Sequence, residues 1–189
     1  MKQTLISLTE DSHLKELLYQ KSNRKQLKYF LETFLELTIS TKMEVFYKEE
    51  FNHVKITEEG IISDLVIKSE DNLIKIKTYH TKTNDFIIHF LIGKSNDEYG
   101  KLLELRFTAN IKEEKEIVTT YSFANKKEPE KTLFKDLIQI KVIELNRLNE
   151  LENSNSFNRW IKFIGAKNRK ELQVIIKEDK LLKELYQKL

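Results

Sequence analysis

One carboxylate and two ammonium groups on neighbouring predicted strands are the residues whose types and spacing suggest chemistry. Asp64 opens the stretch SDLVIKSEDNLIKIKTY, which predicts two strands around a polar turn, and Lys75 and Lys77 lie on the second strand. A magnesium site needs hard oxygen ligands, so an acid would have to follow on the second strand. No acid lies between Leu73 and Thr83.

Helical periodicity predicts the elements at both ends of the chain. DSHLKELLYQ and NRKQLKYFLETFLEL each carry apolar residues on one helical stripe. Near the C-terminus, FNRWIKFIG predicts a helix that ends at Gly165, and Asn168 with Glu171 resembles a capping box that begins the next helix. Further leucines at helical spacing close the chain.

The middle of the chain changes to a two-residue period. MEVFY, IISDLVIK, LIKIKTY, LELRFTANI, IVTTYSF and DLIQIKVIEL predict strands, whereas FIIHFLIGKSNDEYG fits a strand or a helix. The order of helices, strands and helices predicts an α+β or mixed α/β fold. We expect a single domain over residues 1–189, with a helical segment 1–40, a sheet core 41–146 and C-terminal helices 147–189.

The composition is that of an ordinary soluble globular protein, with 40% hydrophobic and 33% charged residues. The chain has no cysteine, which excludes disulfides and cysteine-ligated zinc. We find no signal peptide, and the longest apolar run, Phe86 to Gly93, is far shorter than the ~20 residues that span a bilayer. We therefore expect a cytoplasmic protein without a membrane partner. The net charge of +3 does not by itself favour nucleic acid.

Six segments along the chain resemble, in order, the PD-(D/E)XK nuclease family transposases, also called recombination-promoting nucleases. They are SLTEDSHLKELL, LKYFLETFLEL, GIISDLVIKSEDNLIKIKTY, DEYGKLLELRFTANI, YSFANKKEPEKTLFKDLIQIKVIEL and RWIKFIGAKNRKELQVIIKEDKLLKEL. The resemblance implies a restriction-endonuclease-like fold, with a mixed sheet flanked by helices. It also implies Mg²⁺-dependent phosphodiester hydrolysis, in which an Asp and an acid on the next strand hold the metal.

The resemblance places the metal-binding Asp of the family at Asp64 and its supporting acid at Asp11. The second strand departs from the pattern, because Lys77 stands where the metal-binding Glu belongs and Tyr79 where a Gln or Lys belongs. An ammonium ~4 Å from a carboxylate takes the metal's place electrostatically. We therefore predict that Lys77 and Asp64 face each other as an ion pair. We expect no cofactor, unless the nuclease is active and Asp64 binds Mg²⁺.

Two basic clusters could bind phosphate groups. The first lies on the second predicted helix and the second near the C-terminus; their members are Lys21, Arg24, Lys25 and Lys28, and Lys162, Lys167, Arg169 and Lys170. A solvated helix face explains either cluster alone, so phosphate binding is favoured only if folding brings them together.

Aromatic and histidine residues offer weaker candidates. Phe157, Trp160 and Phe163 could stack on bases, but their helical spacing favours a role in the core. His80 and His89 lack a third metal ligand at suitable spacing, so we expect neither to bind a metal.

Three functions then compete. We favour a catalytically degenerate nuclease-like protein that binds nucleic acid or a nucleic-acid-processing complex, as an inhibitor or regulator in conflict between mobile elements and host defence; an anti-CRISPR protein is one example. The first alternative is an active Mg²⁺-dependent DNA endonuclease in which Glu44 or Glu104 supplies the missing acid. The second is a structural or oligomerisation module. The sequence leaves a homodimer open.

Overall fold

The computed structural model describes Leu14 and residues 18–47, 64–70, 72–82, 85–94, 100–109, 116–122 and 137–188. The chain divides into two compact units. The helical unit comprises Met1–Ile39, Phe107–Ile117 and Ile143–Leu189, and the sheet unit comprises Ser40–Arg106 and Val118–Val142. The segment predicted as the sheet core, 41–146, also includes residues 107–117 and 143–146, which belong to the helical unit.

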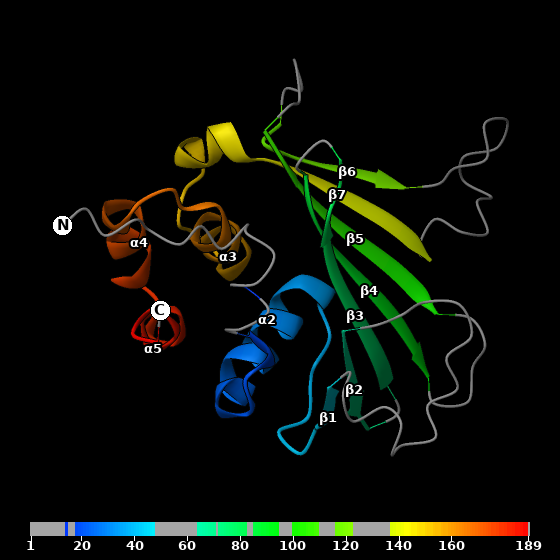
Figure 1. Ribbon diagram of the computed structural model, residues 1–189. Coiled ribbons are helices and arrows are strands. Elements are labelled where there is room, and N and C mark those ends of the chain that lie inside the picture. The colour runs from blue at the N-terminus through cyan, green and yellow to red at the C-terminus, as the bar shows by residue number, and fades with distance from the viewer. Residues whose placement is uncertain are drawn as a thin grey trace, which may run out of the picture. The chain divides into compact units, whose positions relative to one another are not determined.

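Seven strands form one sheet in the order β1-β2-β3-β4-β5-β7-β6 (Figure 1). Their bounds are Glu44–Tyr47 (β1), Leu65–Ser69 (β2), Asn72–His80 (β3), Phe86–Lys94 (β4), Lys101–Thr108 (β5), Val118–Ser122 (β6) and Ile138–Glu144 (β7). The segment with an ambiguous period is strand β4. Each predicted strand has its counterpart in the sheet, and residues 61–63, 110–111, 123 and 136 of the predicted strands lie outside the described residues.

The sheet is mixed. β1 to β4 pair successively in antiparallel fashion. Two hydrogen bonds show that β7 runs parallel to β5. At the start of both strands, the Leu102 N–H donates to the Leu137 carbonyl. Just beyond the end of both strands, the Asn146 side chain donates to the Ala109 carbonyl. With helices before and after this sheet in the chain, the α+β fold predicted from the sequence is confirmed.

Strand alternation gives the sheet two chemically different faces. On the apolar face, Ile74, Ile76 and Thr78 of β3 are buried opposite residues of β4 with the same character. The intervening residues of β3 and their partners on β4 and β5 form the polar face, which we define by Lys75, Lys77, Tyr79, His89, Glu104 and Arg106. The ladder pairs Lys77 with His89 and Tyr79 with Ile87.

Within the described residues, the helical unit contains two short 3-10 helices and four α-helices. Their bounds are Lys21–Asn23 (η1), Arg24–Leu35 (α2), Leu145–Glu150 (η4), Ser156–Gly165 (α3), Arg169–Ile176 (α4) and Lys180–Tyr186 (α5). α3 ends at Gly165 as predicted, and the Asn168 side chain accepts a hydrogen bond from the Glu171 N–H at 3.0 Å, which confirms the cap of α4. No helix in these described ranges is long and apolar enough to cross a membrane.

Aromatic side chains form the centre of the helical unit. Trp160 of α3 is fully buried, and its ring lies 5.1 Å from Phe30 of α2 and 5.9 Å from Phe163. Phe157 packs against Phe34. The core role favoured from the helical spacing is thereby confirmed, and a base-stacking platform of these three residues is excluded because Trp160 and Phe163 have no exposed surface.

Asp179 joins the helices α2, α3 and α5 of this unit. Its Oδ1 caps α5 by accepting from the Leu181 and Leu182 N–H groups, and its Oδ2 accepts from the Tyr29 hydroxyl at 2.7 Å and the Arg159 guanidinium at 3.2 Å. Burial, followed by the hydrogen bond to Asp179, raises the pKa of Tyr29, so that this hydroxyl stays a donor. One buried carboxylate therefore holds α2, α3 and α5 together.

Replacing Asp179 by alanine is expected to lower the free energy of unfolding by about 2–4 kcal/mol, because Arg159 loses its counter-charge and α5 loses its cap. Urea unfolding followed by the fluorescence of Trp160, the single tryptophan, measures this change. The neighbouring Glu178→Ala variant is the matched control, since Glu178 is exposed. Equal stability of the two variants would contradict the role assigned to Asp179.

Candidate functional site

Asp64, the predicted catalytic acid, has a structural role at the start of β2. Its backbone N–H donates to the Ile76 carbonyl at 2.8 Å. Its Oδ2 accepts from the Thr78 N–H at 2.9 Å and lies 3.5 Å from the Thr78 hydroxyl. β2 begins only at Leu65, so no β2 backbone carbonyl is paired with the Thr78 N–H of β3. The Asp64 carboxylate accepts from that N–H instead and so continues the ladder by one hydrogen bond.

The predicted ion pair between Lys77 and Asp64 is wrong. Adjacent strand residues point to opposite faces, and the Asp64 carboxylate bonds Thr78, the residue after Lys77. The Lys77 ammonium instead lies over the Tyr79 ring, 5.9 Å from its centroid, on the polar face. The prediction failed because it treated Asp64 as a strand residue whose side chain points to one face of the sheet. Asp64 precedes β2, and its carboxylate bonds the backbone of β3 instead.

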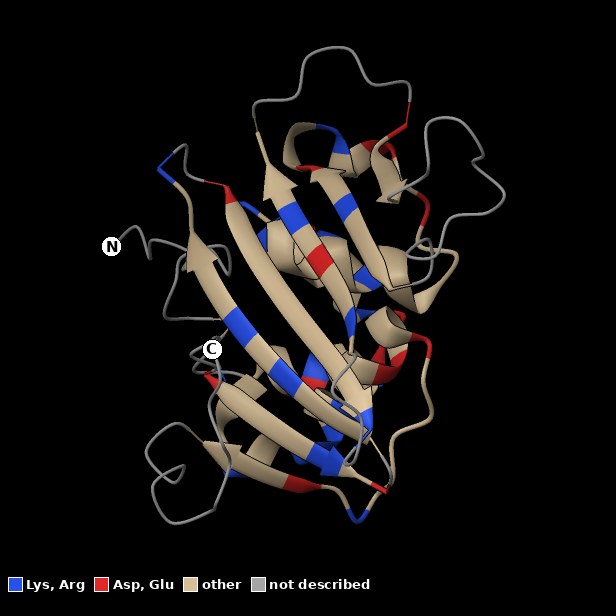
Figure 2. Cartoon of the chain, turned by 90° about the vertical axis from the view of Figure 1, so that its right-hand side faces the viewer, with Lys and Arg blue, Asp and Glu red and all other residues tan. Residues whose placement is uncertain are grey.

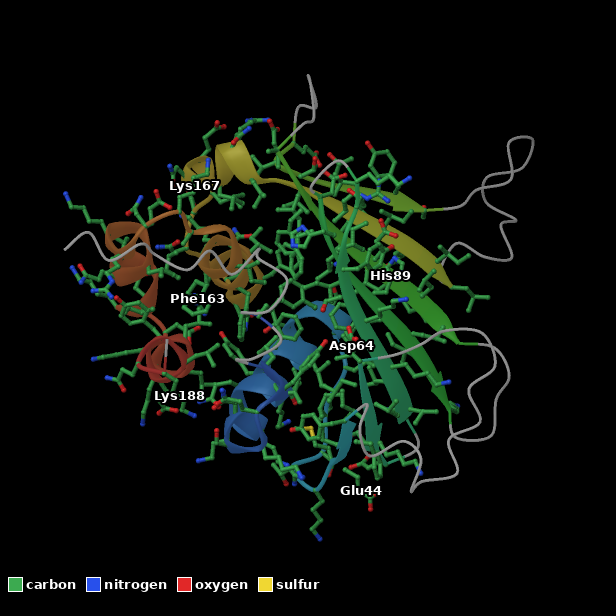
Figure 3. All side chains as sticks on the ribbon, viewed as in Figure 1. Glu44, Asp64, His89, Phe163, Lys167 and Lys188 are labelled. Atoms are coloured by element: carbon green, nitrogen blue, oxygen red, sulfur yellow. The ribbon has the colours of Figure 1, made fainter. Side chains whose placement is uncertain are left out.

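The donors around Asp64 do not fit Mg²⁺. Within the residues that the structure describes, no three His, Asp or Glu side chains are grouped closely enough to hold a metal. Glu44 pairs with Lys68, four residues from Asp64 and so roughly 13 Å along the strand. Glu104 lies on β5, with β3 and β4 between it and β2. Neither supplies the missing acid, and Asp64, Glu44 and His89 lie at separate places (Figure 3). Asp11 lies outside the described residues.

Four side chains of the polar face, Tyr79, His89, Glu104 and Arg106, form a connected cluster across three adjacent strands. His89 Nε2 lies 2.7 Å from Glu104 Oε2 and 3.2 Å from the Tyr79 hydroxyl. Arg106 donates to Glu104 Oε1 from Nε at 2.9 Å and from a terminal nitrogen at 2.7 Å. The Tyr79 and His89 rings meet edge to face at 5.2 Å. We call these four residues the polar-face cluster.

The hydrogen bonds of Glu104 fix the protonation of the cluster. The bond from His89, together with that from Arg106, holds the pKa of Glu104 below its usual range although burial opposes the shift. An ionised carboxylate only accepts, so the proton of the 2.7 Å contact belongs to His89 Nε2. Burial, and next the charge of Glu104, raise the pKa of Tyr79, which keeps its hydroxyl protonated at neutral pH.

Positive charge surrounds the cluster. Lys75 and Lys77 lie on the same face of β3, and the Arg106 side chain is 39% exposed beside its carboxylate partner. Figure 2 views the sheet face on and shows Lys and Arg positions in blue along its strands. Lys75, Lys77, Arg106 and Glu104 give this surface a local excess of two positive charges, which suits an anionic ligand.

Sequence reasoning placed Lys77 and Tyr79 in the site but missed what joins them. The sequence predicts that His89 binds no metal and offers Glu104 only as a metal ligand, so it does not predict the bond between the two. The available signal was a single histidine inside the apolar run FIIHFLIG, which a strand places opposite Lys77. His80, its suggested metal partner, occupies an even position of β3 and so lies on the other face.

The two basic clusters of the helical unit are not brought together. The Lys188 ammonium bonds Asn23, beside the first cluster, and in Figure 3 Lys188 lies well apart from Lys167 of the second cluster. The Lys28 ammonium bonds Glu32 and the Ile39 carbonyl, and that of Lys162 donates to the Leu151 carbonyl at 2.6 Å. The condition that would have favoured joint phosphate binding is therefore not met.

A cavity of about 240 Å³ lies within the helical unit, between η4 and the helices α3 and α4. Leu145, Leu148 and Ile175 contribute apolar walls. Lys162 and Lys167 from the second basic cluster and the acidic Glu171 also line the cavity, so its charged side chains carry a net charge of +1. Lys167 also bonds Asn146 at the wall of the cavity, at 3.3 Å. Such a cavity suits an aliphatic side chain next to an acidic group.

The chain matches no protein-family model, and no curated protein or solved structure matches it either.

Removing the Asp64 carboxylate is expected to destabilise the sheet unit rather than to change a metal site. Asp64→Ala leaves the Thr78 N–H without an acceptor and should cost about 1–3 kcal/mol, whereas Asp64→Asn keeps an acceptor oxygen and should cost less. Urea unfolding followed by circular dichroism compares the two variants. A larger loss for asparagine than for alanine would contradict the ladder-capping role.

Glu104 should make the free energy of unfolding decrease when the solution becomes acidic. Because its folded pKa is lowered from 4.5, its ionised form stabilises the fold fully above about pH 4.5, and this contribution is lost as the pH falls through the folded pKa. The difference in unfolding free energy between wild type and Glu104→Gln should therefore shrink below pH 4.5. Denaturant titrations from pH 7 to pH 3 measure it, with the exposed Glu44→Gln as control. A difference that grows towards low pH would refute the assignment.

Proposed function

We propose that the protein binds single-stranded nucleic acid through the polar face of its sheet and does not cleave it with Mg²⁺. The observation that carries this proposal is the polar-face cluster, in which Tyr79, His89 and Arg106 are fixed through Glu104 beside Lys75 and Lys77. The described residues group no three His, Asp or Glu side chains that could hold a metal ion, so the proposal does not include metal-dependent hydrolysis at Asp64.

The chemistry of this face matches what a single strand presents. Lysine and arginine contact phosphates without reading sequence, and aromatic rings on a sheet surface stack on unpaired bases. Tyr79 offers a half-buried ring with Lys77 over one face and His89 at its edge. Because Glu104 holds Arg106 in place, less side-chain freedom is lost when that guanidinium engages a phosphate.

The biological role follows from the resemblance to the recombination-promoting nucleases. A protein that keeps a nucleic-acid face without the metal chemistry would occupy the substrates of nucleases, as an inhibitor or regulator between mobile elements and host defence. An anti-CRISPR protein would act in this way.

Nucleic-acid binding predicts a strong dependence on salt. A fluorescein-labelled 20-nucleotide single strand of RNA or DNA should bind with a slope of log affinity against log salt near −2, because three cations neutralise about three phosphates. Lys75→Ala and Lys77→Ala should each weaken binding several-fold and reduce the slope by about 0.7. Fluorescence anisotropy at several salt concentrations measures both effects.

Lys94→Ala is the matched control for these variants. Lys94 is an exposed lysine of the same sheet, five residues beyond His89 on β4 and therefore on the opposite face. An equal effect of Lys94→Ala and Lys77→Ala would show that bulk charge rather than the polar face binds the strand. Failure to bind even at low salt would reject the proposal in favour of a structural or oligomerisation module.

A second candidate is binding to a protein of a nucleic-acid-processing complex, and the cavity of the helical unit favours it. Its apolar walls suit an aliphatic anchor, and Lys162 and Lys167 outweigh Glu171 among the lining charges, which suits an acidic group beside that anchor. Val174, which borders the cavity, is 56% exposed. Val174→Glu and Lys167→Glu should abolish association with such a complex in gel filtration and leave the salt-dependent binding of single strands unchanged.

A further inference from the structure

The polar-face cluster contains more than a binding site requires. Glu104 bonds the Nε2 proton of His89, and within the described part of the chain the other ring nitrogen, Nδ1, has no hydrogen-bond partner. The His89 side chain is 24% exposed. A carboxylate that fixes the tautomer of a histidine and leaves its second nitrogen with a free lone pair is the arrangement by which enzymes build a general base.

We propose that the polar-face cluster cleaves single-stranded RNA without a metal ion, with His89 as the general base. This inference rests on the proposed nucleic-acid binding, because the strand must lie on the polar face for the chemistry to occur. The substrate class is RNA rather than DNA, since only RNA carries a 2′-hydroxyl beside each phosphate that can serve as the nucleophile.

Every group that the reaction needs is present in the cluster or beside it. The 2′-oxygen attacks the adjacent phosphorus as His89 Nδ1 takes the 2′-hydroxyl proton, and the phosphorus–5′-oxygen bond breaks. The Tyr79 hydroxyl donates its proton to the leaving 5′-oxygen. The products are a strand ending in a 2′,3′-cyclic phosphate and a strand beginning with a 5′-hydroxyl. Proton transfer through water from His89 to Tyr79 restores both groups, so that no proton is gained or lost.

Tyr79 is suited to the acid role because its hydroxyl proton is not consumed within the cluster. The proton between His89 and Glu104 belongs to Nε2, so the Tyr79 oxygen, 3.2 Å from Nε2, can only accept there and its own proton remains available. The raised pKa of Tyr79 also keeps that proton in place until a strongly basic alkoxide develops.

Arg106 and Lys77 would stabilise the charge that develops on the phosphate. Arg106 uses Nε and one terminal nitrogen on Glu104, so the other terminal nitrogen can face a ligand. Lys77 lies directly opposite His89 on the neighbouring strand. Fixed cations at the position where charge develops are commonly the largest contribution to catalysis. Glu104 is a positioning residue, since it acts through His89 and Arg106.

The test is incubation of a fluorescein-labelled 20-nucleotide single-stranded RNA with the full chain in EDTA, beside the same sequence as DNA and as 2′-O-methyl RNA. We expect cleavage of the RNA alone, with 2′,3′-cyclic phosphate ends identified by mass spectrometry. His89→Ala should lower the rate at least about 100-fold, and added imidazole should restore part of it, which a merely structural histidine would not show. Glu104→Gln should lower kcat by a larger factor than it weakens binding, because it frees the tautomer of His89 as well as the Arg106 side chain.

Control variants and parallel binding measurements separate the cleavage proposal from the nucleic-acid-binding proposal on which it rests. Lys94→Ala should cleave at the wild-type rate. Circular dichroism checks that each variant folds. If His89→Ala does not fold, His89→Gln takes its place in the experiment. RNA that binds by anisotropy but stays intact would overturn the cleavage and leave the binding proposal standing. No binding at all would overturn both. Cleavage of the DNA, or cleavage that survives in His89→Ala, would overturn the mechanism.

Discussion

The nine-residue antiparallel pairing of β3 with β4 is the constraint on which both the core and the candidate site depend. It sets Ile74, Ile76 and Thr78 against Ile92, Phe90 and Ile88, all of them buried or nearly so. A shift of one residue would turn Lys75 and Lys77 into that apolar face, and the cost of burying two ammonium groups excludes it. The register that builds the interior therefore also sets Lys77 opposite His89 and brings Tyr79 within reach of it.

Glu104 links the packing of the sheet to its surface chemistry. Its side chain is only 10% exposed, yet it is ionised because a histidine and an arginine both donate to it. A buried carboxylate of this kind organises its neighbours, since each of them loses rotational freedom to satisfy it. The contrast with Asp64 is instructive. The Asp64 carboxylate accepts from a backbone N–H at the edge of the ladder, whereas the carboxylate of the candidate site, Glu104, lies three strands further into the sheet.

Local patterns predicted most of the fold, and non-local pairing decided the site. The stripe of α2, the cap at Asn168 and the stop at Gly165 each depend on residues within a few positions, so the sequence alone sufficed. Asp64 was assigned to the wrong partner because the point where β2 begins cannot be located from alternation. The bond between His89 and Glu104 joins two strands through a register that only the folded sheet defines, and the ambiguous period around His89 hid the strand itself.

The hydrogen bond between Tyr29 and Asp179 joins two residues far apart in the sequence, which has a consequence for folding during synthesis. Synthesis delivers the apolar stripe of α2 first, and the helices that complete its unit follow only after the whole sheet has been translated. Until then α2 lacks the partners that bury Phe30 beside Trp160. The nascent chain thus carries an unfinished hydrophobic surface through most of its elongation, a state in which chaperones protect chains from aggregation. The sheet hairpins, built from neighbouring segments, have no such delay.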